Sequence, residues 1–122
     1  MHEISICENI VATLEAELQE QQFSLLREIH LNIGALSCIN PSILTKVFTQ
    51  VIADGPFCNC TLHTNFIEVV AGCDVCHQTF KVENNKFICP VCSKPFSTII
   101  QGNELTIYKI ILEEHAYAEV NK

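Results

Sequence analysis

The chain has 122 residues, of which 48% are hydrophobic, and its seven Lys and Arg against fourteen Asp and Glu give a net charge of −7. The length allows one compact unit or two very small ones, the apolar content excludes a disordered chain, and no apolar run approaches the ~20 residues that span a bilayer. Because nucleic-acid phosphates require a basic face, the acidity disfavours a nucleic-acid partner and favours a metal cation or a basic protein surface.

The first element in chain order is a helix, predicted from about Ile4 to Gln22. Its apolar residues recur at spacings of three and four, as on a buried helix face; they are Ile6, Ile10, Val11, Leu14 and Leu18. A strand is predicted next, from Glu28 to Ile33, because every second residue is apolar. His30 falls on the polar side of this strand and is expected to face solvent, and Gly34 ends the strand.

A second helix is predicted to begin at Asn40-Pro41, with Asn40 as the N-cap and Pro41 at the first helical position. Gly55-Pro56 is expected to stop it. The apolar residues that we expect on its buried face are Leu44, Val47, Phe48, Val51 and Ile52.

Two strand-like segments enclose the cysteine-rich region that follows. Thr61–Glu68 leads into it and Thr98–Leu112 returns from it, with a turn at Gly102-Asn103, so the region is predicted to be an insertion on a stem of these two strands. The final part, Leu105–Leu112, is an apolar run that needs a partner to be buried against. We therefore predict that it pairs with the Glu28–Ile33 strand.

Four cysteines form two Cys-x-x-Cys pairs, Cys73 with Cys76 and Cys89 with Cys92, separated by twelve residues. Zn²⁺ prefers four tetrahedral ligands, and each such turn can aim two sulfurs at one point. The intervening segment is predicted to fold back as two short strands around an Asn84-Asn85 turn, since Asn tolerates positive φ. The spacing predicts a structural zinc site, and four thiolates leave no open position for a catalytic zinc.

Other interpretations of these cysteines are weaker. A redox Cys-x-x-Cys needs no second pair, and a disulfide framework needs a secreted chain, whereas the opening residues show no basic region followed by an apolar core. We therefore expect a cytoplasmic protein with metal-bound thiolates. The remaining cysteines are expected to be small buried hydrophobes, with Cys58-x-Cys60 a weak alternative metal pair; they are Cys7, Cys38, Cys58 and Cys60.

A second chemical signal lies at the start, where Met1, His2 and Glu3 stand in succession. A free terminal amine, the next backbone nitrogens and the His2 imidazole can close fused chelate rings on one metal. Such a donor set favours square-planar or tetragonal Ni(II) or Cu(II). Most histidines at position two are simply solvated, so this signal alone is weak.

The combination of motifs is more specific than any one of them. Met1-His2-Glu3-Ile4-Ser5, the segment Ile33-Gly34-Ala35-Leu36-Ser37-Cys38 and the two cysteine pairs occur in this order and at these distances. Together they resemble the HypA/HybF family of nickel metallochaperones over about residues 1–114. The resemblance implies an α+β fold in which two helices pack on a three-stranded sheet, with an inserted zinc-ribbon-like β module held by four cysteines. It places a nickel domain at 1–65 plus 104–122 and a zinc domain at 66–103.

The resemblance also implies a function and a set of partners. Nickel would be held by Met1, His2 and Glu3, zinc would be held by the four paired cysteines, and nickel would pass with the GTPase HypB to the large subunit of [NiFe]-hydrogenase, or to urease. Whether Asn40 or His77 contributes to either metal site stays open. We expect a metallochaperone and not an enzyme; the alternative function is a zinc-ribbon adaptor without a nickel role. Exchange of the last strand between two chains would give a homodimer. If His2 does not bind nickel, the remaining imidazoles to test are His30, His63, His77 and His115.

Overall fold

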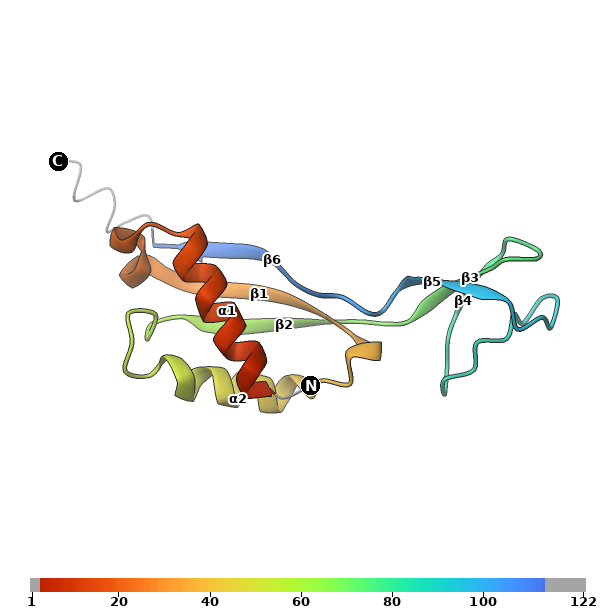
Figure 1. Ribbon diagram of the computed structural model, residues 1–122, viewed down its shortest axis with the longest axis horizontal. Helices are drawn as coiled ribbons and strands as arrows, with labels where there is room; N and C mark the ends of the chain where they lie inside the picture. Colours follow the sequence, from red (N-terminus) through yellow and green to blue (C-terminus); the bar gives the residue numbers. More distant parts are fainter. Residues whose placement is uncertain (1–2, 114–122) are drawn as a thin grey trace. The chain divides into compact units, whose positions relative to one another are not determined.

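The computed structural model describes residues 3–113 of the chain, and its helices and strands form two compact units. One unit comprises residues 3–31, 39–65 and 107–113, and the other comprises residues 32–38 and 66–106. Figure 1 labels the α-helices and the strands. In chain order the elements are α1 (Glu3–Glu17), the 3₁₀ helix η1 (Glu20–Leu25), β1 (Leu26–Gly34), the 3₁₀ turn η2 (Ala35–Ser37), α2 (Pro41–Ile52), β2 (Thr61–Ile67), β3 (Val70–Cys73), β4 (Thr79–Lys81), β5 (Ser97–Gln101) and β6 (Leu105–Leu112).

In the first unit, two helices pack on a three-stranded sheet, which confirms the predicted α+β fold class. The strand order is β2-β1-β6, so β6 lies beside β1 as predicted (Figure 1). Both helices contribute one buried stripe to a common core with alternate residues of the strands; its members in this unit include Ile6, Ile10, Leu14, Ile29, Leu31, Leu44, Phe48 and Leu62. Among residues 3–113, no helix is both long and apolar enough to cross a bilayer.

The two helices differ from the sequence prediction in detail. Helix α1 ends at Glu17 and not at Gln22, because the chain turns into η1, where the backbone N–H of Gln19 donates to the Gln22 side chain at 2.8 Å. This turn brings Phe23 to Phe57, with ring centroids 4.8 Å apart. Helix α2 starts as predicted, because the Asn40 side chain accepts hydrogen bonds from the first-turn amides at 3.0 and 3.2 Å. Val51, expected to be buried, is 39% exposed.

The second unit is built on β3, which pairs antiparallel with β4 on one side and β5 on the other. The predicted turn is present, since Asn84 and Asn85 have φ of 53° and 59°. The prediction of two short strands around this turn is wrong. The turn carries only an isolated Glu83–Lys86 bridge, and β4 pairs with β3 instead.

The predicted stem differs in one respect. The returning segment is not one strand but is divided into β5 and β6. The interruption falls at Gly102, whose φ of 117° is one that residues with a side chain rarely adopt.

Gly34, at the end of β1, lies against this interruption. Its N–H donates to Glu104 O at 2.7 Å, and the N–H of Leu36 donates to Gly102 O at 2.8 Å. A Cβ on Gly34 would lie 2.2 Å from Gly102 O, which is a backbone atom and has no freedom to swing away.

We therefore expect Gly34→Ala to lower the free energy of unfolding by about 1–3 kcal/mol or more, since either backbone segment must shift. Denaturant unfolding monitored by circular dichroism measures this loss. Gly55→Ala is the matched control, because a Cβ there would only meet Ile52 O at 3.8 Å. Equal stability of the two variants would contradict the close approach.

Candidate metal centre

Two backbone turns of the same form carry the four paired cysteines. In the first turn, Cys73 N–H donates to Gln78 O at 2.8 Å and His77 N–H donates to Cys73 O at 3.0 Å. His77 has φ 64°, which closes the turn behind its second cysteine. The second turn repeats the pattern with Cys89 N–H to Lys94 O at 3.1 Å, Ser93 N–H to Cys89 O at 2.8 Å, and φ 62° at Ser93. Each Cys-x-x-Cys segment therefore projects its two sulfurs toward the same side.

The four sulfurs come together as the sequence spacing predicts. Cys73 Sγ lies 3.4 Å from Cys92 Sγ, and Cys76 Sγ lies 3.6 Å from Cys89 Sγ. All four ligand atoms lie within 4.8 Å of one another. A tetrahedral ion with Zn–S bonds of about 2.3 Å has S···S edges of about 3.8 Å, so this cluster fits a four-thiolate zinc site.

Backbone amides are aimed at two of the sulfurs. Cys73 Sγ accepts from the N–H groups of Val75 and Cys76, both at 3.4 Å, and Cys89 Sγ accepts from Val91 N–H at 3.4 Å. The amide of Cys76 and then that of Val75 lower the pKa of Cys73 to about 6, although burial opposes this. Donated N–H groups stabilise the thiolate, the form that binds metal.

The pKa of the Cys89 thiol is also lowered, whereas the pKa values of the Cys76 and Cys92 thiols are raised. The pKa of Cys89 is lowered chiefly by the amide of Cys92. Cys76 and Cys92 also receive a backbone N–H each, which lowers their pKa, but burial and the hydrogen bonds shared with the other thiols raise it, and the net shift is upward. Four adjacent thiolates repel one another, so a divalent cation is the group that allows all four to ionise together.

The residues of the expected nickel site are only partly described. Met1 and His2 lie outside the described residues, and Glu3 is the first residue of α1, where it is half-buried. Asn40 acts as the cap of α2. His77 is exposed beside the first cysteine pair, and its imidazole is not among the clustered ligand atoms.

The four unpaired cysteines divide into two kinds. Cys7 and Cys60 are buried as expected, and burial raises the pKa of each thiol to about 11, so both stay protonated at neutral pH. The same expectation is wrong for Cys38 and Cys58, which are exposed. Cys38 lies in a turn, with φ 58°, where its side chain has no core to pack against.

Sequence reasoning missed a second group of potential metal ligands, formed by Glu28, His30 and His63. His30 is not solvent-facing as predicted, because its side chain is only 18% exposed and stacks on the His63 ring. His30 lies between apolar residues of the alternating strand β1, His63 follows the buried Leu62 on β2, and the adjacency of β1 and β2 is what brings the two histidines together. The sequence alone does not indicate that β1 and β2 are neighbours in the sheet, so it could not predict this group.

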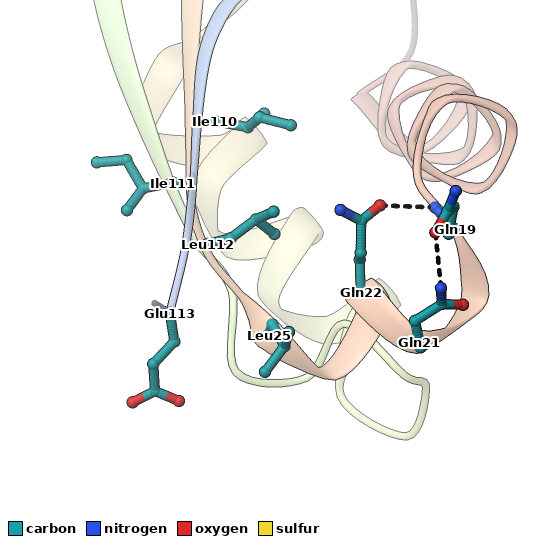
Figure 2. Close-up of a pocket in the computed structure, with 8 residues that line it drawn as sticks. All are labelled: Gln19, Gln21, Gln22, Leu25, Ile110, Ile111, Leu112 and Glu113. Atoms are coloured by element: carbon teal, nitrogen blue, oxygen red, sulfur yellow. Dashed lines mark hydrogen bonds between the residues drawn. The ribbon is translucent and has the colours of Figure 1, made fainter. Parts of the chain in front are cut away.

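A cavity of about 570 Å³ lies between η1 and the end of β6, and Figure 2 shows its lining. Ile110 and Leu112 point toward the side of Gln22, whereas Ile111 points away. The wall consists of glutamine amides and alkyl groups, and its one carboxylate, Glu113, pairs with Arg27. Amides and alkyl groups supply neither a nucleophile nor a soft metal ligand, so we assign no site there.

Comparison with known proteins places this chain in one family. The family model described as "Hydrogenase/urease nickel incorporation, metallochaperone, hypA" matches residues 1–112. Hydrogenase maturation factor HypA of Actinobacillus succinogenes is 30% identical over 113 residues, which cover 93% of this chain and 100% of that protein. The HypA of Methylocella silvestris is 33% identical over 120 residues, with the same coverage.

Solved structures agree in fold. The solution structure of the Ni metallochaperone HypA from Helicobacter pylori superposes with a TM-score of 0.64 at 23% identity, over 93% of this chain and 98% of that one. A second HypA solution structure gives a TM-score of 0.66 at 23% identity, over 92% and 96% of the two chains. From the family match over residues 1–112, this chain belongs to the HypA family and is a metallochaperone of hydrogenase and urease nickel incorporation, not an enzyme.

Proposed function

We propose that this protein captures Ni(II) at its N-terminus and delivers it for the maturation of [NiFe]-hydrogenase or urease. The observation that carries the proposal is that the family match begins at residue 1, so that it includes Met1, His2 and Glu3. The acidic balance, with a net charge of −7, suits a carrier of cations.

Capture relies on donors that the chain start itself supplies. His2 provides an imidazole, and the terminal amine and the first backbone nitrogens complete the chelate, in which Glu3 contributes chiefly its backbone. Imidazole and deprotonated amide nitrogens together select Ni(II) or Cu(II) in a square-planar or tetragonal arrangement. A site made of the chain end exposes its ligands, so an incoming ligand of the recipient can displace them one at a time.

The four-cysteine centre has a different role. Cys73, Cys76, Cys89 and Cys92 would hold zinc, whose binding supplies folding free energy to the second unit. Because the four thiolates fill a tetrahedral site, the bound ion offers no position to a substrate. The proposed division is therefore a nickel domain at 1–65 plus 104–122 and a zinc domain at 66–103, with nickel as cargo and zinc as a structural ion.

Partners and compartment follow from the same proposal. The GTPase HypB and the hydrogenase large subunit receive or hand on the nickel in the cytoplasm, where thiols stay reduced. Strand β6 is the edge strand of its sheet, next to β1. Its side chains Tyr108 and Ile110 are 52% and 37% exposed. Exchange of this strand between two copies would give a homodimer.

A change to the chain start tests the proposal directly. We expect a Gly-Ser extension ahead of Met1 to weaken Ni(II) binding strongly, because it converts the terminal amine into a peptide nitrogen. Absorption titration in the d–d region of square-planar Ni(II) compares the N-terminal chelate of the extended and unextended proteins, with zinc content as the control that should not change. Equal nickel affinity would favour the alternative, a zinc-ribbon adaptor that tolerates any extension.

A further inference from the structure

The polar side of β1 carries a group of three potential metal ligands that belongs to neither the four-cysteine centre nor the N-terminal nickel site. Glu28 and His30 lie two residues apart on β1, so both project to the same side of the strand. His63 lies on β2, which neighbours β1 in the sheet. Their ligand atoms lie within 4.8 Å of one another.

The two imidazoles converge on a single carboxylate oxygen. His30 Nε2 lies 2.8 Å from Glu28 Oε1, and His63 Nε2 lies 3.5 Å from the same oxygen. Two ligands bound at about 2.1 Å to one ion, tetrahedral or octahedral, are about 3.0–3.4 Å apart. The two N···O separations are therefore close to those expected around one ion, and since all three ligand atoms lie within 4.8 Å of one another, small movements close the group on an ion.

The rings must tilt when an ion enters. They are stacked, with centroids 4.7 Å apart and planes 12° from parallel, and an ion bound in the plane of both rings requires the planes to intersect. His63 is free to make this movement, because its side chain is 46% exposed, whereas His30 is held by Glu28 and by the edge of Tyr108 at 5.9 Å. One ligand is thus held in place and the other adjusts.

We propose that Glu28, His30 and His63 form a third metal site, for a divalent transition-metal ion such as Ni(II), Co(II) or Zn(II). Two neutral imidazoles and one carboxylate are the donors that these borderline ions prefer, and water fills the remaining positions. The site is built from strand residues and does not use Met1 or His2, so it stands or falls independently of the N-terminal nickel site.

The test uses the full-length, zinc-loaded chain with His2→Ala in every variant, so that the N-terminal chelate is removed. We expect this protein to retain one Ni(II) per chain by equilibrium dialysis. Water-containing octahedral Ni(II) is paramagnetic, whereas the square-planar chelate is diamagnetic, so the bound ion should broaden the imidazole NMR signals of His30 and His63.

Three further substitutions locate the ion. His63→Ala should lower Ni(II) affinity at least about tenfold and abolish the broadening, since even outer-shell changes cost about 10- to 100-fold. Glu28→Gln, which preserves shape, should also lower it, and His77→Ala removes an exposed imidazole that is not part of the group and should have no effect. The proposal is overturned if the His2→Ala chain binds no nickel, or if His63→Ala and Glu28→Gln bind it as tightly as His77→Ala does. Comparison of the unsubstituted chain with His2→Ala reports separately on the N-terminal site.

Discussion

Cys89→Ser is expected to remove the zinc and to unfold the second unit while the first unit stays folded. The buried apolar cluster of this unit consists of Ala71, Cys73, Phe80 and Cys89, so two of its four members are themselves proposed ligands. Such a small cluster cannot offset the entropy of ordering the chain, whereas structural zinc contributes about 10–16 kcal/mol in comparable small sites. Elemental analysis should show a fall from one zinc per chain to none, and amide NMR signals of residues 66–106 should collapse toward random-coil positions.

Cys58→Ser provides the matched control, because Cys58 is exposed and lies outside the cluster of four sulfurs. It should retain one zinc per chain and the full set of dispersed signals. Zinc removal by a chelator should reproduce the effect of Cys89→Ser in the unsubstituted chain. The structural role is refuted if freshly purified protein carries no zinc, or if the chelated protein keeps its amide dispersion throughout residues 66–106.

His2→Ala is expected to abolish specific Ni(II) binding at the N-terminus without changing zinc content or fold. The substitution deletes the only imidazole of the proposed chelate, and amide nitrogens seldom deprotonate around a metal without such an anchor. Because the loss of an outer-shell partner alone costs about 10- to 100-fold in affinity, loss of this ligand should exceed about 100-fold. Absorption titration in the d–d region of square-planar Ni(II) measures the N-terminal chelate specifically.

Glu3→Gln is a second variant, from which we expect a smaller loss of nickel affinity than from His2→Ala. Its proposed donor is the backbone, so its nickel affinity should stay within about tenfold of the parent. Thermal unfolding should be unchanged in both variants, because the proposed ligands precede or begin α1 and the core starts at Ile6. If His2→Ala keeps the square-planar absorption of the parent, the nickel chelate lies elsewhere in the chain.

Local chemistry explains which features could be predicted from the sequence. Asn40 followed by Pro41 specifies a helix start because the side-chain oxygen caps amides two and three residues later. The spacing of each cysteine pair matches one backbone turn, so the two turns and their convergence follow from the motif. The alternation along β1 predicted its buried side for the same reason, since a strand repeats every two residues.

Contacts between segments distant in the chain decided the rest. The turn after α1 is anchored by the contact of Phe23 with Phe57, and the returning segment is interrupted where Gly34 and Gly102 meet backbone to backbone. The pairing of β1 with β2 turns His30 from an expected solvent-facing residue into part of a three-ligand group. In the described chain, local sequence therefore determined the turns, the caps and the geometry of each cysteine pair, because the partners in each of these lie within a few residues. Only the tertiary structure determined strand order and the Glu28–His30–His63 group, because those depend on which distant segments pack together.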